Sequence, residues 1–441
     1  MLDLIKEYII KFTDFVCGWP LFTLLIGGGI FLFIYSRALP LRRLGMAVRS
    51  LKMKEKGEGQ VSSFQALMNT ISSTVGMGNI AGVAIALCVG GPGAIFWMWV
   101  SALLGMATKF FEGTLAIMYK GKDDKGVAQG GPMFVLTEGL GRKMRPLAVM
   151  FAFCALFGGL PVMQANQLSE SLYSVILKPM GVPDSRWVFL VIGLVIGGIV
   201  SLVIFGGLKR ISQVSSKMVP IMVGFYFLMV LGIMIVYHDR LPAVFESIFE
   251  GAFCWKAGFG AFTAVALTGA RRAMYVNEAG VGTAGMMHGA SMNAEPVREG
   301  LVAMLGPAID SGLVCTLSAI PMIMAGLYST DNIEGLSIAL NTYDSLIPYV
   351  GRYLLEFVVT IFAFSTMFSY SYYGTMCTSY LWGTRHAQKY RYFYVATIVL
   401  ASVITLDVAV SLMDLAFALM AFPNMIAVFA LAPKVMKEAR R

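Results

Sequence analysis

Charged side chains are scarce in this sequence. Of its 441 residues, 13% are Asp, Glu, Lys or Arg, whereas ordinary soluble domains carry about 25%. Long hydrophilic stretches are missing as well, so no segment offers itself as a domain outside a membrane. Hydrophobic residues make up 57% of the chain. This composition excludes an ordinary soluble domain and indicates an all-α polytopic membrane protein with one membrane domain over residues 1–441.

The motifs of common enzymes are also missing. The three histidines, His238, His288 and His386, lie far apart in sequence, without the spacing of metal ligands. The sequence contains no H-E-x-x-H, G-x-S-x-G or G-x-x-x-x-G-K-[ST] motif. Its six cysteines are scattered without a C-x-x-C pair and are interpreted as small apolar fillers. The sequence therefore predicts a protein that is not an enzyme.

Long apolar runs alternate with short polar connections. A membrane-crossing helix needs about 20 mostly apolar residues, and eleven runs meet this expectation. They are centred on residues 19–36, 61–87, 91–118, 147–175, 187–206, 212–237, 257–276, 300–326, 350–380, 391–408 and 410–433. The first sixteen residues combine apolar and charged positions at helical spacing, so we expect an amphipathic helix at the membrane interface there.

Basic residues are concentrated on one side of the predicted membrane. The net charge of +9 would suit a nucleic-acid partner, but many of the basic residues lie in the connections 37–56 and 120–145 and in the tail 434–441. The intervening connections are poorer in Lys and Arg, and the connection 327–346 is acidic. Under the positive-inside rule, this predicts an outside N-terminus and a cytoplasmic C-terminus. The lipid bilayer of the cell membrane, and no nucleic acid, is the expected partner.

A glycine-rich stretch interrupts the second apolar run at half depth. It reads Val-Gly-Met-Gly-Asn-Ile-Ala-Gly from Val75 to Gly82. A helix in hydrocarbon must satisfy its own backbone groups, so a loosened segment is tolerated where protein, water or a ligand takes over those groups. The alternative is a small-xxx-small packing face at Gly78 and Gly82. We favour a binding site, because broken helices near the midplane are typical of transporters.

The freed backbone groups of this break suit a zwitterion and a small cation. Amides near Gly76, Met77 and Gly78 would receive a carboxylate, which glycine allows to approach closely. Hard oxygen ligands for sodium lie beside them: the carbonyls of Ser72, Thr74 or Val75, the hydroxyl of Thr74 and the amide oxygen of Asn79. A bond to a neighbouring helix is the alternative role for Asn79. The pattern predicts a coupled site for an amino acid and a sodium ion.

Two further runs carry polar groups at membrane depth. The run 147–175 has four of them within two helical turns: Gln164, Asn166, Gln167 and Glu170. Such groups usually face a cavity or a polar partner, so Gln164, nearest the midplane, is a candidate substrate ligand. The run 350–380 offers the hydroxyls of Ser365 and Thr366 as candidate sodium ligands and Tyr370 as a wall of the substrate pocket. Interhelical hydrogen bonding is the alternative for each of these residues.

Charged residues inside the apolar runs admit two interpretations. Arg271 and Arg272 precede Asn277 and Glu278 at the end of the run 257–276. The arginines fit a cytoplasmic gate or structural lock, and equally an ordinary positive-inside anchor. Asp310 fits a proton carrier, and equally an acceptor of a hydroxyl bond from a neighbouring helix.

A second glycine-interrupted segment runs from Ala257 to Thr263. Without the first run, the other ten divide into two blocks of five, residues 61–237 and 252–433, and each block opens on an interrupted helix. Blocks with an odd number of spans have opposite orientations in a membrane, so this pattern permits a 5+5 inverted repeat with discontinuous helices. Residues 1–60 would add the interfacial helix, one extra N-terminal span and a basic cytoplasmic linker.

Taken together, these residues resemble the alanine or glycine:cation symporter family. The resemblance is carried by Thr74-Val-Gly-Met-Gly-Asn-Ile-Ala-Gly-Val-Ala, Gly90-Gly-Pro-Gly-Ala-Ile-Phe-Trp-Met-Trp, Gly105-Met-Ala-Thr-Lys-Phe and Val276-Asn-Glu-Ala-Gly. It extends over nearly the whole chain. It implies the five-plus-five fold of sodium-coupled transporters and sodium-driven uptake of a small neutral amino acid, with sodium as the co-transported ion.

The resemblance also implies site residues in runs two, four, seven and nine. The residues that match implied substrate positions are Gly76, Gly78, Asn79 and Gln164. The predicted substrate site also includes Met77 and, in the seventh and ninth runs, Gly260, Phe262, Thr263, Thr366 and Tyr370. The implied sodium residues are Ser72, Val75, Ser365 and Thr366.

The chain departs from the family pattern at several positions. Met77 stands where threonine is usual, Val276 replaces serine, Ser369-Tyr370 replaces glycine-tryptophan, and Thr375 replaces glutamate. Because tyrosine is smaller than tryptophan and carries a hydroxyl, we expect a pocket somewhat larger or more polar than an alanine-sized one.

The sequence as a whole predicts a sodium-coupled secondary active symporter that imports an alanine- or glycine-like amino acid by alternating access. The first alternative is a proton-coupled transporter of a larger or more polar amino acid. A channel or receptor on the same scaffold is less favoured, because the repeated filter loops that line pores are not visible in the sequence.

Overall fold

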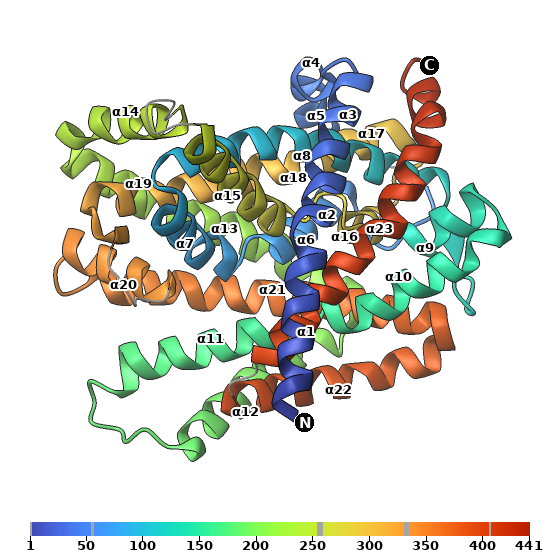
Figure 1. Ribbon diagram of the computed structural model, residues 1–441. Helices are drawn as coiled ribbons and strands as arrows, with labels where there is room; N and C mark the ends of the chain where they lie inside the picture. The colour runs from blue at the N-terminus through green and yellow to red at the C-terminus, as the bar shows by residue number, and fades with distance from the viewer. Residues whose placement is uncertain (1, 54–56, 254–258, 330–334, 405–406) are drawn as a thin grey trace.

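The protein is built almost wholly from helices. The computed structural model describes residues 2–53, 57–253, 259–329, 335–404 and 407–441, and Figure 1 shows helices following one another through these ranges. Within them, the β structure is one short antiparallel hairpin, apart from a single isolated bridge. The predicted helical architecture is therefore confirmed.

The elements follow one another in chain order. The first part contains α1 (Leu2–Cys17), α2 (Trp19–Phe22), η1 (Thr23–Gly27), α3 (Gly28–Tyr35), α4 (Leu39–Arg42), α5 (Leu44–Ser50), α6 (Ser63–Thr74), η2 (Met77–Asn79), α7 (Ala81–Gly90), α8 (Gly93–Met118), β1 (Gly121–Lys122), β2 (Ala128–Gln129), α9 (Pro132–Phe134), η3 (Val135–Gly139), η4 (Arg142–Met144), α10 (Arg145–Gly158), α11 (Val162–Leu172), η5 (Tyr173–Leu177), α12 (Arg186–Ile204) and α13 (Gly207–Val236). The second part contains η6 (His238–Arg240), α14 (Leu241–Ala252), α15 (Phe259–Asn277), α16 (Thr283–Gly289), α17 (Pro296–Ala303), α18 (Leu305–Pro307), η8 (Ala308–Val314), α19 (Cys315–Ala325), η9 (Leu327–Ser329), α20 (Gly335–Leu346), α21 (Gly351–Trp382), α22 (Thr384–Val403) and α23 (Asp407–Glu438).

Eight helical stretches of the described residues are long and apolar enough to cross a membrane, and α6 with α7 adds a ninth as one bent span. They are Glu7–Tyr35, Gly93–Met118, Arg142–Leu177, Arg186–Ile204, Gly207–Val236, Pro296–Ala325, Gly351–Trp382 and Ser411–Glu438. The predicted number of eleven is not confirmed. The described parts of the remaining two predicted runs lie in α15, which carries Arg271 and Arg272, and in α22, which begins with a basic segment, together with the start of α23.

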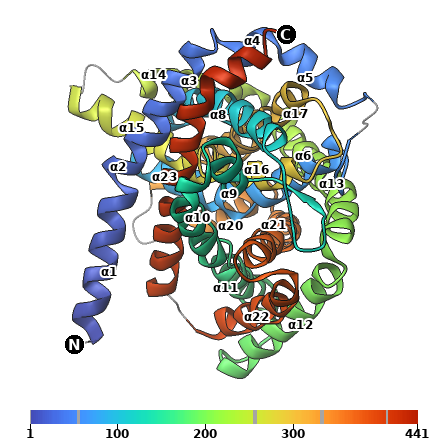
Figure 2. The ribbon, with the colours of Figure 1, turned by 90° about the vertical axis from the view of Figure 1, so that its right-hand side faces the viewer.

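The first span starts earlier than the sequence suggested. Helix α1 continues through α2, η1 and α3, so that Glu7–Tyr35 is one helical stretch. Figures 1 and 2 show α1 beside α23 and crossing the direction of α11, α21 and α22. The contact is made by Thr13 Oγ1, which donates to the carbonyl of Ser411 at 3.3 Å. That α1 lies at the membrane interface stays a prediction.

Two long helices, α8 and α21, form the centre of the molecule. Helix α8 packs against α15 and α17, while α21 packs against α6, α10 and α22. Small residues allow close approach on α8: a β-carbon on Gly105 would lie 3.2 Å from that of Ala279, and one on Gly113 would lie 2.6 Å from that of Ala303. Both long helices therefore sit within contact of the broken helices described below.

The hairpin of β1 and β2 ties the surface to the start of α22. Its strands pair Gly121 with Gln129 and Lys122 with Ala128. At its tip, Asp124 accepts from the backbone N–H of Thr384 at 3.0 Å and from its hydroxyl at 3.1 Å. These two donors, the backbone N–H first, hold the pKa of the Asp124 carboxyl below its usual value.

Candidate functional site

The interruption predicted between Val75 and Gly82 is present. Helix α6 ends at Thr74, and the chain resumes through η2 into α7 with a bend of 63°. Val75 (φ −81°, ψ 97°) and Gly76 (φ −146°, ψ −157°) are extended. The backbone therefore leaves the helical hydrogen-bond pattern at the predicted place.

Asn79 holds the first break in shape. Its Oδ1 accepts from the backbone N–H of Gly76 at 2.9 Å, and its Nδ2 donates to the carbonyl of Asp310 at 3.2 Å. The side chain is fully buried and lies outside the cavity lining. Asn79 thus replaces the acceptor that a continuous helix would give Gly76, and its bond to Asp310 of η8 is the contact with a neighbouring helix that was named above as the alternative.

Backbone groups of the first break are left for another partner. Among the described residues, no acceptor reaches the amides of Met77 and Gly78, and no backbone donor reaches the carbonyls of Thr74 and Val75. Buried backbone groups are rarely left unpaired in a native structure. The break therefore offers two donors and two acceptors to a ligand.

The candidate sodium residues of α6 and α21 are brought together. Ser72 Oγ donates to the carbonyl of Ser365 at 2.8 Å, and Ser365 Oγ donates to the carbonyl of Ser72 at 3.3 Å. Ser215 of α13 adds a hydroxyl, 3.3 Å from Ser72 Oγ. Hydroxyl and carbonyl oxygens are the ligands that hard cations prefer. Ser72 and Ser365 are two of the predicted sodium residues; Thr366 follows Ser365 directly, and Val75 lies three residues after Ser72. That these oxygens bind sodium stays a prediction.

Glycine at position 76 is required by a neighbour. A β-carbon there would lie 2.6 Å from Thr366 Oγ1. The first break therefore contacts α21 directly, through Thr366.

The second break lies later than predicted. Residues 259–263, expected to be interrupted, form the first turns of α15, while Ala257 and Gly258 lie outside the described residues. Instead, the chain breaks between α15 and α16, where Glu278, Gly280 and Gly282 have φ values of 53°, 93° and 98°. Three left-handed residues within five positions cannot belong to a right-handed helix. The Gly-x-Gly pattern after Asn277 carried this signal in the sequence.

Helix α8 supports the second break from behind. Glu112 Oε1 accepts from the amide of Gly280 at 3.0 Å and from Asn424 Nδ2 at 2.6 Å. Gly105, Lys109 and Glu112 are spaced so that they share one face of α8. Lys109 is fully buried and interacts electrostatically with the carboxylates of Glu112, Glu278 and Asp310. Lys109 thus connects Glu278 of the second break electrostatically with Asp310, whose backbone carbonyl accepts from Asn79 of the first break.

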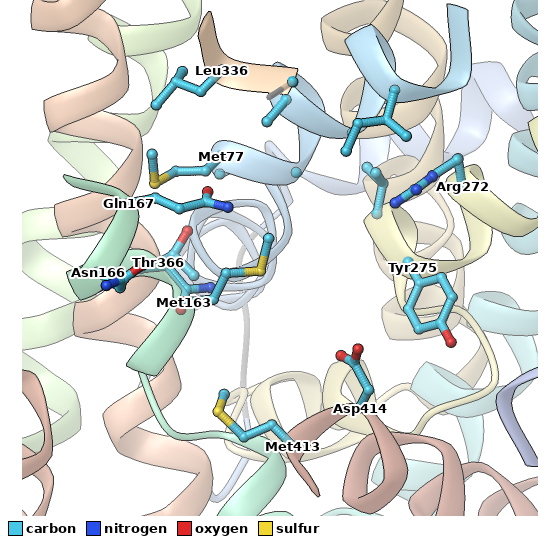
Figure 3. Close-up of a pocket in the computed structure, with 18 of the residues that line it drawn as sticks. Met77, Met163, Asn166, Gln167, Arg272, Tyr275, Leu336, Thr366, Met413 and Asp414 are labelled. Atoms are coloured by element: carbon cyan, nitrogen blue, oxygen red, sulfur yellow. The ribbon is translucent and has the colours of Figure 1, made fainter. Parts of the chain in front are cut away.

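A cavity of about 1060 Å³ lies between the two breaks and the helices around them. Figure 3 shows Met163, Asn166 and Gln167 of α11 facing Arg272 and Tyr275 of α15 across the open space. The predicted residues that line it are Thr74, Gly76, Met77, Gly78, Gln164, Thr366 and Tyr370. Gln164 Oε1 is buried without a hydrogen-bond partner in the described part of the chain. Most of the predicted substrate residues are therefore gathered around one cavity.

Other predicted residues lie away from it. Ser72, Val75 and Ser365 are buried behind the lining, as Asn79 is. Phe262 packs edge-on against Trp97 with ring centroids 5.4 Å apart, and Thr263 is exposed. Gly260 is in the first turn of α15, and its surroundings lie outside the described residues. Because the break is displaced, the lining part of α15 is its later half.

Several lining residues were not predicted as site residues. Arg271, Arg272 and Tyr275 approach the cavity from α15, and Asp414 approaches from α23, as Figure 3 shows for three of them. As in the sequence, the arginines precede the second break. Their role as a cytoplasmic gate, a structural lock or a membrane anchor stays a prediction. Their helical spacing ahead of the Asn-Glu-Ala-Gly stretch was the available signal.

A separate polar cluster closes the end of α6 opposite the break. The carboxylate of Glu299 accepts from Ser63 Oγ at 2.5 Å and from Asn293 Nδ2 at 3.1 Å, and it pairs with His288 Nδ1 at 2.6 Å. All of these side chains are buried. The cluster joins the start of α6 to the end of α16 and the start of α17.

Two interrupted helices that line a shared polar cavity define a class of protein. Discontinuous helices paired around a central site are typical of secondary transporters. The comparisons with known proteins agree with this class. A family model described as the sodium:alanine symporter family matches residues 2–441. The chain belongs to the sodium:alanine symporter family, which confirms the resemblance found in the sequence.

Relatives and one solved structure extend this result. The sodium/alanine symporter AgcS of Methanococcus maripaludis is 36% identical over 440 residues, which cover 97% of this chain and 95% of AgcS. The probable sodium/glutamine symporter GlnT of Bacillus subtilis is 30% identical over 446 residues, covering 98% and 89%. The crystal structure of MhsT in complex with L-phenylalanine matches with a TM-score of 0.61 at 13% identity, covering 87% of this chain and 93% of MhsT. This last likeness concerns the fold alone.

Proposed function

We propose that the protein is a sodium-coupled symporter that imports a small neutral amino acid across the cytoplasmic membrane by alternating access. The observation that carries this proposal is the first break. Met77 and Gly78, whose amides have no partner among the described residues, line the cavity, and Ser72 at the end of α6 is bonded to Ser365 of α21. An α-carboxylate on these amides and a sodium ion on the neighbouring oxygens would be held by one loosened segment.

The coupling follows from that shared segment. A sodium ion bound near Ser72, Val75, Ser365 and Thr366 would stabilise the extended backbone, and the same backbone presents the amides to the substrate. Each ligand then raises the affinity for the other by the same factor, because binding free energies are linked. Sodium is cargo in this scheme, alongside the amino acid.

Architecture and orientation belong to the same proposal. We propose one extra N-terminal span followed by a 5+5 inverted repeat over 61–237 and 252–433, within one membrane domain. The two breaks occur in α6–α7 and α15–α16, which supports paired discontinuous helices in the two halves. The distribution of basic connections supports an outside N-terminus and a cytoplasmic C-terminus.

Uptake into proteoliposomes tests the proposal. Purified protein is reconstituted, and a panel of labelled neutral amino acids is offered with an inward sodium gradient, with equal sodium on both sides, and with choline. We expect concentrative uptake of alanine or glycine with the gradient alone. Equilibration without accumulation would indicate a channel instead, and accumulation driven equally well by a proton gradient in choline would indicate proton coupling.

A larger or more polar substrate is the second candidate, and two observations favour it. The cavity of about 1060 Å³ is larger than an alanine molecule needs, and a relative is described as a probable sodium/glutamine symporter. Competition separates the two candidates. If serine and glutamine displace labelled alanine as well as alanine does, the larger substrate is correct; if only alanine and glycine compete, the small one is.

A further inference from the structure

Among the carboxylates that line the cavity in the described part of the chain, that of Glu278 is the buried one. The lining also contains the carboxylates of Glu170 and Asp414, but both of these residues are exposed. Glu278 is 1% exposed and has a φ of 53°, inside the second break. A left-handed conformation is uncommon for a residue with a side chain, and such residues cluster at binding and catalytic sites.

The carboxylate of Glu278 has neutral partners. Tyr370 OH donates to Oε1 at 2.6 Å, and Thr283 Oγ1 donates to Oε2 at 2.6 Å. Within the described residues, no Lys, Arg or His forms an ion pair with it. Lys109 interacts with it electrostatically but serves Glu112 and Asp310 as well. A carboxylate accepts about four hydrogen bonds, so roughly two positions on Glu278 are open to a cation.

One face of α21 connects this carboxylate to the first break. Thr366 and Tyr370 are four residues apart and therefore lie on the same face of the helix. Thr366 contacts Gly76, where a β-carbon would lie 2.6 Å from its Oγ1, and Tyr370 donates to Glu278. On the other side, a β-carbon on Gly78 would lie 3.9 Å from Val276 Cγ2, two residues before Glu278. The free amides and the buried carboxylate thus flank the same part of the cavity.

We propose that Glu278 receives the α-ammonium group of the transported amino acid, while the amides of Met77 and Gly78 receive its α-carboxylate. This inference rests on the proposed function and assigns the opposite end of the same ligand. Tyr370 and Thr283 are positioning residues, since their hydroxyls fix the two oxygens of the carboxylate. The site therefore selects α-amino acids and rejects the carboxylic acids that lack the amino group.

The rejection has a physical cause. A carboxylic acid without the ammonium group would leave the buried carboxylate of Glu278 without an ion-pair partner, because Lys109 is shared with Glu112 and Asp310. A buried charge without a close partner is costly. An α-amino acid brings the missing positive charge together with its hydrogen-bond donors. Glu278 is then a determinant of specificity for the backbone of the substrate, independent of the substrate's side chain.

The test compares Glu278→Gln with the wild type in proteoliposomes under a sodium gradient. Uptake of labelled alanine is competed with unlabelled alanine and with propionate, which lacks the ammonium group. We expect the variant to bind alanine roughly 10- to 100-fold more weakly, the range for losing a hydrogen bond between charged groups, with competition by propionate unchanged or stronger. Glu356→Gln is the matched control, because Glu356 is a buried carboxylate of α21 outside the lining, and it should leave the alanine-to-propionate ratio as in the wild type.

Three results would overturn the inference. Unchanged alanine affinity in Glu278→Gln is one, and an equal loss for alanine and propionate is another. The third is a change confined to the sodium concentration for half-maximal uptake, which would make the bound cation sodium. Should Glu278→Gln fail to fold, Tyr370→Phe removes one donor and should lower the same ratio by a smaller factor; an unchanged ratio there also contradicts the inference. A wild type without sodium-driven uptake contradicts the proposed function itself.

Discussion

At the scale of single residues, Gly76 and Asn79 decide the shape of the first break. Asn79 supplies an acceptor for the Gly76 amide and a donor for the Asp310 carbonyl, so one side chain joins the break to η8. The spacing of Gly76 and Gly78 around Met77 was visible in the sequence. The direction of the Asn79 side chain was not, because an amide can turn toward a ligand or toward its own backbone with the same spacing.

Replacement of Gly76 by alanine tests the contact with Thr366. The added β-carbon would lie 2.6 Å from Thr366 Oγ1, and such overpacking costs about 1–3 kcal/mol. We expect substrate affinity or uptake rate to fall by roughly 5- to 150-fold, the factor that corresponds to this cost. Gly198→Ala is the control, since a β-carbon there would meet nothing within 4 Å. Equal uptake by both variants would contradict the contact.

Replacement of Asn79 by leucine tests the support of the break. It leaves the Gly76 amide and the Asp310 carbonyl without their partner, and each buried group left unpaired costs about 1–3 kcal/mol. We expect a lower melting temperature in detergent and weaker sodium dependence of uptake. Asn341→Leu, on α20 where the side chain is half-buried and accepts from Arg352, should cost less. A melting temperature equal to that of the wild type would show that the hydrogen bonds of Asn79 do not stabilise the first break.

At the scale of elements, the two breaks were predicted with different success. The first was located because its glycines stand inside an apolar run, where unpaired backbone is conspicuous. The second was placed at Ala257–Thr263, but glycine among apolar residues is also compatible with a continuous helix, and from Phe259 onward α15 is one. The real signal, Gly280 and Gly282 beside Glu278, lay among polar residues and was interpreted only through family resemblance.

The packing of α6 against α16 also gives a prediction, for the polar cluster at the end of α6 opposite the first break. Glu299→Gln replaces a carboxylate that binds Ser63, Ser291, Asn293 and His288. An amide has one oxygen acceptor and would place an NH₂ group against donors. We expect α16 to loosen from α6, with a loss of stability of about 1.5–3 kcal/mol for hydrogen bonds to a charged group.

Thiol labelling in detergent measures that loosening. Cys377 is fully buried and its Sγ lies 3.7 Å from the sulfur of Met286 on α16, so its peptide reports on the position of α16. Labelling of this peptide, followed by mass spectrometry, should be faster in Glu299→Gln than in Glu295→Gln, an exposed position one turn away. The same rate in both variants would mean that Glu299 does not hold α16.

At the scale of the whole molecule, the fold class and the family were accessible from the sequence, whereas the number of spans was not. Apolar composition and the break motif are local properties, and both survived comparison with the structure. The predicted number of eleven spans is not confirmed, because α15 and α22 carry basic residues inside otherwise apolar helices. Length and hydropathy do not distinguish a helix that lines a polar cavity from a helix outside the membrane.

Linkage between the ligands is the prediction at this scale. If sodium and alanine bind through the same break, each should stabilise the folded protein more in the presence of the other. We expect alanine to raise the melting temperature in sodium chloride and to have little effect in choline chloride. The shift with sodium should grow by the same coupling free energy when alanine is present. An alanine effect of equal size in both salts would contradict a shared segment.

Helix α21 has no interruption over its 32 residues, and it touches both broken helices, through Thr366 at Gly76 and through Tyr370 at Glu278. A rigid element with two such contacts imposes a geometric constraint. A rotation at one break would shift α21 and, with it, the contact at the other break, so we expect the two broken helices to move together. The segment α6–α7 and the segment α15–α16 could then move at the same time without a direct bond between the two segments.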